Sequence, residues 1–313
     1  MPMRRCVVLA LPRFAAVLAA LPFFAAACST GSTVPGSVSA QSGGLSPAAK
    51  KCSPKLYVSS YKLNYVAIYC TKGHNQAPIG KITDGINGPE GENVDNKGNL
   101  YVTNTTANTV TEYAPGTVTP SFTYSSGLGD PAGVATDKQR NVYITSLRPA
   151  SLKVFPQASN TPSLTITNLP YPIDVALDAS GNAFVTTYTA GYKSGEIIEY
   201  SAGSTNGNNL GIVTIEPGGI GLDKAGDIVT ADQGLPGVLV FPPGKTKPSK
   251  TFAQNTIDPD PVRFEKDERR VYVGDAIGNA VYVYDYPSGT LVDTITDGID
   301  GPNGLALDPA PPL

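Results

Sequence analysis

The sequence predicts an all-β protein, a six-bladed β-propeller of four-stranded antiparallel blades in which the C-terminal strand closes the N-terminal blade. Three observations predict this fold. A strand-rich unit recurs roughly every 40–50 residues, a spacing typical of repeat architectures. The 313 residues include 33 Gly and 28 Pro and are only 16% charged, which favours strands joined by tight turns. The two ends of the chain also carry complementary parts of one repeat.

Each repeat opens with a proline and a short apolar alternation that ends in an acid. We interpret this segment as the innermost strand of a blade, because proline sets the bend where a strand begins. The prolines are Pro89, Pro131, Pro172, Pro217, Pro259 and Pro302. The acids are Asp95, Asp137, Asp178, Asp223, Glu265 and Asp308. We expect these acids to hydrogen-bond into the Gly/Asn turns that follow them.

Three further strands follow in each repeat. The second strands open at Leu56, Leu100, Val142, Ala183, Ile228 and Val271. The third strands end in an aromatic residue, at Tyr69, Tyr113, Phe155, Tyr200, Phe241 and Tyr284. A turn such as "APGTVTP" then leads into a weaker fourth strand. Because one four-stranded sheet cannot bury both of its faces, we expect six such sheets to pack face to face around an axis.

The ends of the chain predict how the ring closes. The repeats begin with a second strand, at Leu56, and stop after a first strand, residues 302–308. The last strand must therefore lie beside the first, with Ala306 near Tyr57, which removes an open sheet edge. Residues 52–313 are thus predicted to form the propeller, and the final "PAPPL" cannot continue a ladder.

The N-terminus predicts export. Residues 1–27 have arginines followed by an apolar run that is short for a membrane span and ends in small residues before Cys28, as in a signal peptide. Residues 25–28 (Ala-Ala-Ala-Cys) resemble a bacterial lipoprotein box, with Ala25 where that motif usually has Leu. The resemblance implies that Cys28 becomes the lipidated mature N-terminus. Ala25 and Ala27 also suit ordinary signal peptidase, so simple secretion is the alternative.

Residues 28–51 are rich in Ser, Gly, Pro and Ala, and we interpret them as the lipidated Cys and a flexible tether. Cleavage after residue 27 removes three arginines and no acid, which shifts the net charge from −3 to −6. We expect an exported protein anchored by its lipid on the periplasmic or cell-surface face of a bacterial membrane, or secreted if Cys28 is not lipidated. Its membrane contact would be through the lipid only.

Two cysteines remain in the predicted propeller, Cys52 just ahead of the first strand and Cys70 at the end of its hairpin neighbour. Outside the cytosol two leftover thiols most often pair, so we predict a Cys52–Cys70 disulfide. No basic cluster points to nucleic acid, and the single His74 and the lack of a Cys/His cluster exclude zinc or haem ligation of the usual kind. "PPGKT" at residues 242–246 lacks the first Gly of a phosphate loop and is interpreted as a turn.

One side of the predicted channel mouth is polar. First strands begin, and second strands end, on the same face of a propeller, so the residue after each repeat proline lies on one rim. These residues are Glu90, Ala132, Ile173, Gly218, Asp260 and Asn303. The polar members belong to blades that ring closure makes neighbours, whereas the other half is nearly bare. Further candidate binding residues on the same strands and rim are Glu92, Asn93, Asn104, Arg263 and Asp275.

The segment "PEGENVDNKGNLYVTNTTANTVTEYAPG" resembles NHL-repeat and SMP-30/gluconolactonase-type six-bladed propellers, and the resemblance covers residues ~52–308. It implies a divalent cation such as Ca²⁺ at the mouth, held by Glu90 and Asn303, with Asp260 as a ligand and as the base that acts on water. The family draws its ligands from more widely spaced blades and in a different order, and it usually has another Asn where this chain has Ala132 and Ile173.

These observations favour a rigid module that binds a protein or a small-molecule ligand, and we expect it to be a monomer. The alternative is a metal-dependent lactonase or related hydrolase that uses the channel mouth. A third interpretation makes the polar residues structural, with Arg263 paired to Glu92 or Asp260.

Overall fold

The computed structural model describes residues 45, 51–167 and 169–311. The predicted signal peptide, Cys28 and nearly all of the predicted tether lie outside the described residues. Among the described residues, no helix has the length and apolar character needed to cross a membrane.

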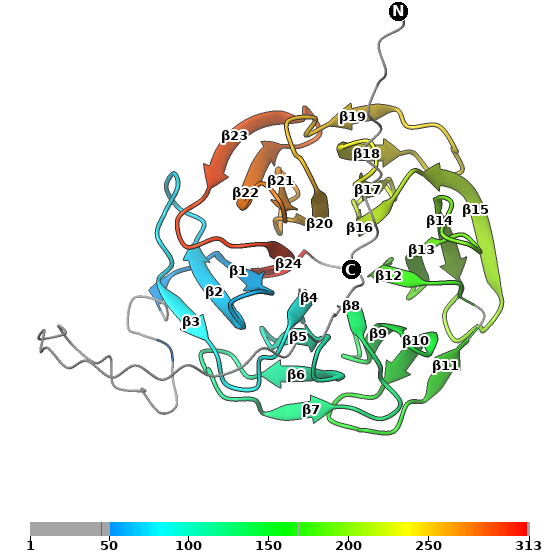
Figure 1. The fold of residues 1–313 in the computed structure, drawn as a ribbon, viewed down its shortest axis with the longest axis horizontal. Helices are drawn as coiled ribbons and strands as arrows, with labels where there is room; N and C mark the ends of the chain where they lie inside the picture. The colour runs from blue at the N-terminus through cyan, green and yellow to red at the C-terminus, as the bar shows by residue number, and fades with distance from the viewer. Residues whose placement is uncertain (1–44, 46–50, 168, 312–313) are drawn as a thin grey trace, which may run out of the picture. The chain divides into compact units, whose positions relative to one another are not determined.

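The described residues form 24 strands in six four-stranded antiparallel sheets (Figure 1). Blade 1 consists of β24 (Pro302–Asp308), β1 (Lys55–Ser60), β2 (Tyr65–Cys70) and β3 (Gly80–Ile82). Blade 2 consists of β4 (Pro89–Val94), β5 (Leu100–Asn104), β6 (Thr109–Tyr113) and β7 (Phe122–Tyr124). Blade 3 consists of β8 (Pro131–Thr136), β9 (Val142–Leu147), β10 (Ala150–Phe155) and β11 (Leu164–Ile166).

Blade 4 consists of β12 (Pro172–Leu177), β13 (Ala183–Tyr188), β14 (Gly195–Tyr200) and β15 (Gly207–Thr214). Blade 5 consists of β16 (Pro217–Leu222), β17 (Ile228–Asp232), β18 (Gly237–Phe241) and β19 (Lys250–Phe252). Blade 6 consists of β20 (Pro259–Phe264), β21 (Arg270–Asp275), β22 (Ala280–Asp285) and β23 (Thr290–Ile295). Every innermost strand begins at a repeat proline, as the sequence predicts.

The innermost strands contact one another in ring order, β24–β4–β8–β12–β16–β20 and back to β24 (Figure 1). We call the face on which these strands begin the proline face. The loops from the fourth strand of one blade to the first of the next, and from second to third strands, lie there. The loops from first to second and from third to fourth strands lie on the other face, which we call the reverse face.

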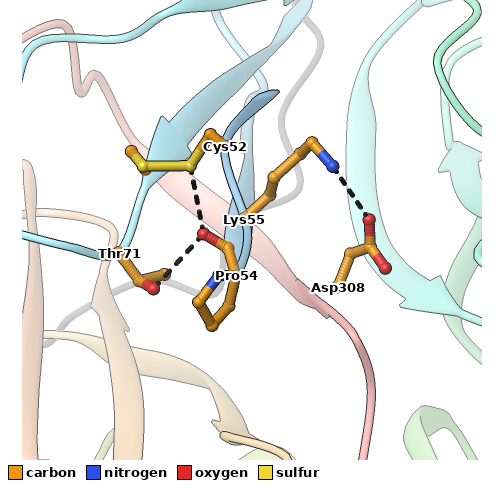
Figure 2. The surroundings of a disulfide bond; sticks show 6 residues. Cys52, Pro54, Lys55, Thr71 and Asp308 are labelled. Atoms are coloured by element: carbon orange, nitrogen blue, oxygen red, sulfur yellow. Dashed lines mark hydrogen bonds and ion pairs between the residues drawn. A yellow bond between two sulfur atoms is a disulfide. The ribbon is translucent and has the colours of Figure 1, made fainter. Parts of the chain in front are cut away.

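The C-terminal strand closes the ring. β24 pairs antiparallel with β1, with Tyr57 opposite Ala306 and Leu56 opposite Leu307, which confirms the predicted closure. The Lys55 ammonium lies 3.2 Å from the Asp308 carboxylate at the end of this pair (Figure 2). The edge that a second strand would otherwise expose is therefore paired along its length.

Apolar side chains fill the spaces between adjacent blades. The fourth residue of each innermost strand packs against the preceding blade, as Val134 does against Tyr101 and Val110 of blade 2. The next residue packs against the following blade, as Ala135 does against Val175 and Val185 of blade 4. The aromatic residues that end the third strands are all buried in these layers.

Hydroxyl groups on the second strands tie neighbouring blades together near the axis. Each donates to the backbone carbonyl of the residue after the repeat proline in the next blade. The pairs are Ser59 to Glu90 at 3.0 Å, Thr103 to Ala132 at 2.9 Å, Thr145 to Ile173 at 3.0 Å and Thr186 to Gly218 at 2.9 Å. Thr230 donates to Gly219 of its own blade, and the sixth position is Gly274. This set of interblade hydrogen bonds was not predicted from the sequence.

Backbones also approach closely at the axis. A Cβ added to Gly304 would collide with the Glu90 carbonyl oxygen, and one added to Gly91 would collide with that of Ala132. Four of the six recurrent acids, Asp95, Asp137, Asp178 and Asp223, bond into the following turns as predicted, whereas Asp308 pairs with Lys55. Asp95 accepts hydrogen bonds from the Lys97 and Asn99 amides, and Asp178 accepts from the equivalent amides of blade 4.

The start of the described chain is attached to the reverse face. Cys52 and Cys70 form a disulfide that joins the segment before β1 to the end of β2 (Figure 2). The Pro54 carbonyl accepts a hydrogen bond from the Thr71 hydroxyl at 3.3 Å beside it. Leu45 is buried in the layer between blades 1 and 2, and its amide donates to the Gly116 carbonyl, in the reverse-face loop after β6.

Candidate functional site

Three polar residues stand at the predicted channel mouth. Glu90, Asp260 and Asn303 are each the second residue of an innermost strand, β4, β20 and β24, and these strands are neighbours in the ring. All three side chains are half-buried. Their strands begin on the proline face, so the three residues lie at the mouth end of the channel.

Glu92 and Asn93 do not belong to the mouth. Glu92 is fully buried and lies opposite Val102 on β5, so it shares the side of the sheet that packs on blade 1. Asn93 faces blade 3, where its amide donates to the Thr136 hydroxyl at 2.7 Å. The prediction that both residues lie at the rim does not hold, because successive strand residues face opposite sides of the sheet and the pairing of β4 with β5 is irregular between Pro89 and Glu92.

Glu92 is chemically unusual for its position. The equivalent residues of the other blades are Val134, Val175, Ile220, Val262 and Leu305. Neither carboxyl oxygen of Glu92 has a hydrogen-bond partner among the described residues. Burial raises the pKa of the Glu92 carboxyl well above its usual range, and the nearby Arg263 guanidinium offsets only part of this shift. The Glu92 carboxyl therefore lies in the apolar layer between blades 1 and 2, where its burial lowers the free energy of unfolding.

Arg263 pairs with Asp174 from blade 4. The Nη1–Oδ2 and Nη2–Oδ1 distances are 2.9 and 3.3 Å. Nη1 also donates to the Ile220 carbonyl, and Oδ2 accepts from the Ile220 amide, so the pair includes blade 5. Asp174 stands where four other blades have Gly, and the sequence analysis named Glu92 or Asp260 as the partner of Arg263.

Asn104 and Asp275 hold loops of the proline face. The Asn104 side-chain oxygen accepts from the Asn87 amide at 2.9 Å, and its amide group donates to Thr111. The Asp275 carboxylate accepts from the amides of Ile257, Asp258 and Gly278. These oxygens, which were predicted as binding groups, are therefore occupied by the chain's own donors.

The half of the rim that the sequence predicted to be nearly bare is aromatic. Tyr171, Tyr188 and Tyr192 of blade 4 meet with ring centroids 5.0–6.0 Å apart. Ala132 and Leu147 pack with Tyr171 on this side. A signal was available, because Tyr171 precedes its repeat proline where the other blades have Gly, Asp or Glu.

The Glu216 carboxylate lies beside this aromatic cluster. The Tyr188 hydroxyl donates to the Glu216 carboxylate at 3.0 Å. Burial, together with the negative charges of Glu216 and Asp260, raises the pKa of the Tyr188 hydroxyl. Asp260 therefore acts electrostatically on the tyrosine side of the mouth as well as on its own blade.

The oxygen set at the mouth meets part of what a hard cation needs. Two carboxylates and one amide, from Glu90, Asp260 and Asn303, are the predicted donors, whereas Ca²⁺ takes about 6–8 oxygens. No group of three or more His, Cys, Asp or Glu side chains placed to hold a metal occurs in the part of the chain that the structure describes. Carbonyls and waters would have to complete the site, and the metal site stays a prediction.

Exposed apolar side chains gather on the proline face. Nine large apolar side chains are exposed among the described residues. Seven of them lie in proline-face loops: Tyr61, Leu63, Tyr192, Ile215, Leu235, Ile257 and Ile277. They come from blades 4, 5, 6 and 1, which are consecutive in the ring. We call this set the apolar arc.

The apolar arc does not extend over blades 2 and 3. Ile215 and Ile257, which are 56% and 57% exposed, stand two residues before their repeat prolines. The equivalent residues of blades 2 and 3 are Asn87 and Gly129. A contiguous exposed apolar patch marks an interaction surface, and the recurrence of these side chains in loops of one face makes the proline face the candidate for such a surface.

Comparison with known proteins shows the fold. No protein-family model matches the chain, and no curated protein matches it significantly. A chain of the nidogen/laminin complex has a TM-score of 0.66 and 16% identity, covering 81% of this chain and 98% of that chain. A protein of unknown function from Bacteroides caccae has a TM-score of 0.64 and 11% identity, with the same coverage. Kuenenia stuttgartiensis hydrazine synthase has a TM-score of 0.60 and 14% identity, covering 80% and 85%. At these identities the similarity extends to the propeller alone.

Proposed function

We propose that this protein is a rigid binding module that recognises a partner protein through the loops of its proline face. The observation that carries the proposal is the location of the apolar arc, which holds seven of the nine exposed large apolar side chains. Water-exposed Ile, Leu and Tyr side chains gain free energy when a partner covers them, at roughly 25 cal/mol per Å² of apolar surface buried. A surface of this kind needs no catalytic group.

The propeller is a suitable support for such a surface. Interblade hydroxyl bonds, such as that of Thr103 to the Ala132 carbonyl, and the β1–β24 closure fix the blades relative to one another. Loops on a fixed frame lose little conformational entropy when they bind. The similarity to a chain of the nidogen/laminin complex supports the proposal only in that this fold occurs in a complex of two proteins.

The attachment of the N-terminal segment supports an orientation. Leu45 and the Cys52–Cys70 disulfide fix the incoming chain to the reverse face. With Cys28 lipidated, as the sequence predicts, the tether would reach the propeller at its reverse face, and the apolar arc lies on the face opposite this attachment. We therefore propose an extracytoplasmic lipoprotein of the NHL-like type that presents its proline face outward.

A substitution experiment tests this proposal. Leu235, Ile257 and Ile277 are exchanged together for Ser, and the control exchanges the exposed Leu291, at the reverse-face end of β23, for Ser. Wild type and both variants, checked for equal thermal stability, are immobilised and incubated with cell-envelope proteins. Proteins retained by wild type and by the control but lost from the triple variant support the proposal, and equal retention by all three contradicts it.

A further inference from the structure

The charge of the proline face differs from that of the reverse face. The acids in the proline-face loops are Asp84, Asp130, Glu216, Asp258, Asp297 and Asp300. The bases in these loops are Lys62, Arg148 and Lys193. Glu90 and Asp260 add two carboxylates at the channel mouth. The face that carries the apolar arc is therefore acidic.

The reverse face is nearly balanced, so the acidity is not a property of the whole surface. The acids in its loops are Asp95, Asp137, Asp178, Asp223, Asp227, Glu265, Asp267 and Glu268. The bases are Lys72, Lys97, Lys138, Arg140, Lys224, Lys245, Lys247, Lys266 and Arg269. Among the loop residues, the net negative charge therefore lies on the face that carries the exposed apolar side chains.

In two loops of the arc an acid directly follows the exposed apolar residue, whereas Lys62 and Lys193 stand in two others. Ile215 is followed by Glu216, and Ile257 is followed by Asp258. The two isoleucines are more than half exposed, whereas the two acids are half-buried beside them. A partner that covers the isoleucines must therefore bring its own groups close to these carboxylates, and a cationic group costs least there.

Blade 4 adds aromatic surface at the end of the arc. Tyr192 is 60% exposed and packs edge-on against Tyr171. Tyr192 also packs on Tyr188, whose hydroxyl donates to the Glu216 carboxylate. An exposed aromatic ring suits a guanidinium or ammonium group, which gains from the ring face and from negative charge nearby. Tyrosine is also enriched at protein interfaces for its rigid apolar area.

We infer that the partner covering the apolar arc is a polypeptide surface with aliphatic side chains among lysines or arginines. This inference rests on the proposed function and names the partner's chemistry. The same charges argue against two other occupants. An anionic membrane surface would repel the face, and so would a second copy of the chain docking arc to arc.

Selection from a random peptide display library on the full mature chain tests this inference without a known partner. Wild type is expected to enrich peptides that combine Leu or Ile with Lys or Arg. A charge variant carries Glu216→Gln, Asp258→Asn, Asp297→Asn and Asp300→Asn, which keep shape and remove charge. Its matched control carries Asp227→Asn and Asp267→Asn on the reverse face.

An enriched cationic peptide is then synthesised and titrated against each protein. The charge variant lacks four carboxylates that would each form an exposed charge pair with the peptide. Because exposed pairs contribute little individually, we expect about tenfold weaker binding at low salt. The control variant is expected to bind as wild type does, and salt is expected to weaken wild-type binding. The Leu235/Ile257/Ile277 serine variant is expected to lose the peptide.

The outcomes separate this inference from the proposed function. Enrichment of acidic or uncharged peptides, no enrichment at all, or unchanged affinity in the charge variant overturns the inference. If the serine variant still loses binding, the proposed function survives. Flotation of the unlipidated chain with phosphatidylserine vesicles, or arc-dependent dimerisation in sedimentation, overturns the inference in favour of a membrane or a second copy.

Discussion

Arg263 on β20 and Asp174 on β12 form a two-point ion pair that joins blades 4 and 6 and includes the Ile220 backbone of the blade between them. The two side chains are 17% and 8% exposed, so water screens the pair weakly. Asp174 replaces the Gly of other blades, and Arg263 replaces a small or amide residue, which indicates that the two positions act together.

Breaking this pair from one side should destabilise the protein. Arg263→Ala leaves the Asp174 carboxylate buried without its counter-charge, and we expect the free energy of unfolding to fall by about 3 kcal/mol in urea denaturation. The double variant Arg263→Ala/Asp174→Gly restores residues found at these positions in other blades and should recover most of that loss. A double variant as unstable as the sum of the two single variants would show that the residues do not interact.

Glu92→Leu should stabilise the protein, because it places an aliphatic side chain where other blades have Val, Ile or Leu. We expect a gain of about 1–3 kcal/mol at pH 7, since the carboxyl of Glu92 is buried without a hydrogen-bond partner. Chemical denaturation of both proteins measures the difference. Lower stability of the leucine variant would mean that the carboxyl has a favourable partner.

The Glu92 substitution should also have a defined pH dependence. The pKa of Glu92 is raised in the folded protein, so folding binds a proton between its unfolded and folded pKa values. The wild type is therefore best stabilised below the unfolded pKa and loses stability as pH rises toward the folded pKa. The advantage of Glu92→Leu over wild type should grow from pH 4 upward, and Glu92→Gln should remove the same dependence. A constant difference across this range would contradict the raised pKa.

Thr103→Val should weaken the contact between blades 2 and 3. It removes the hydroxyl donor and leaves the Ala132 carbonyl without it, at a cost of about 1 kcal/mol in the free energy of unfolding. Thr103→Ser keeps the donor and serves as the control, so it should cost less. Equal losses for Val and Ser would assign the effect to packing.

The disulfide should account for a large part of the stability of blade 1. Replacement of Cys52 and Cys70 by Ser should lower the free energy of unfolding by about 3 kcal/mol, because the unfolded chain regains the entropy of an open loop. Thiol titration of the unfolded, unreduced mature protein should find neither cysteine reactive. Two reactive thiols would show that the bond is not formed.

The predicted cation site can be tested by thermal denaturation. If Glu90, Asp260 and Asn303 bind Ca²⁺ or Mn²⁺, ion at 100 times the dissociation constant should stabilise wild type by about 2.7 kcal/mol. Asp260→Ala should abolish the shift. No shift in wild type, together with no lactone hydrolysis, would remove the lactonase alternative.

The fold could be predicted well because each repeat carries its own strand and turn residues within a short stretch of sequence. Each innermost strand starts at a repeat proline, and the pairing of Tyr57 with Ala306 follows from the partial repeats at the two ends. The turn bonds of Asp95 and Asp178 were predicted for the same reason, since an acid and its turn are adjacent in the chain.

The site was predicted less well because it depends on which way side chains face between blades. Glu92 and Asn93 were assigned to the rim from their positions along β4 alone, whereas successive side chains face opposite sides of a strand and the pairing of β4 with β5 is irregular after Pro89. The partner of Arg263 lies two blades away, and the alternation of side chains along one strand does not reveal such a contact. Apolar residues in turns, such as Leu235 in "DQGLPG" and Ile277 in "DAIGNA", could have predicted the apolar arc from the sequence. They were overlooked because the site was sought among polar residues.

The disulfide also determines how a mechanical load on the N-terminal segment would spread. Tension reaching Cys52 passes directly into Cys70 at the far end of β2, as well as into β1, which is hydrogen-bonded to β24 on its other side. The β1–β24 pair therefore does not bear the force alone, because part of it enters blade 1 through β2, which is paired with β1 on its other side. A module pulled by its own tether while its opposite face holds a partner would stay a closed ring.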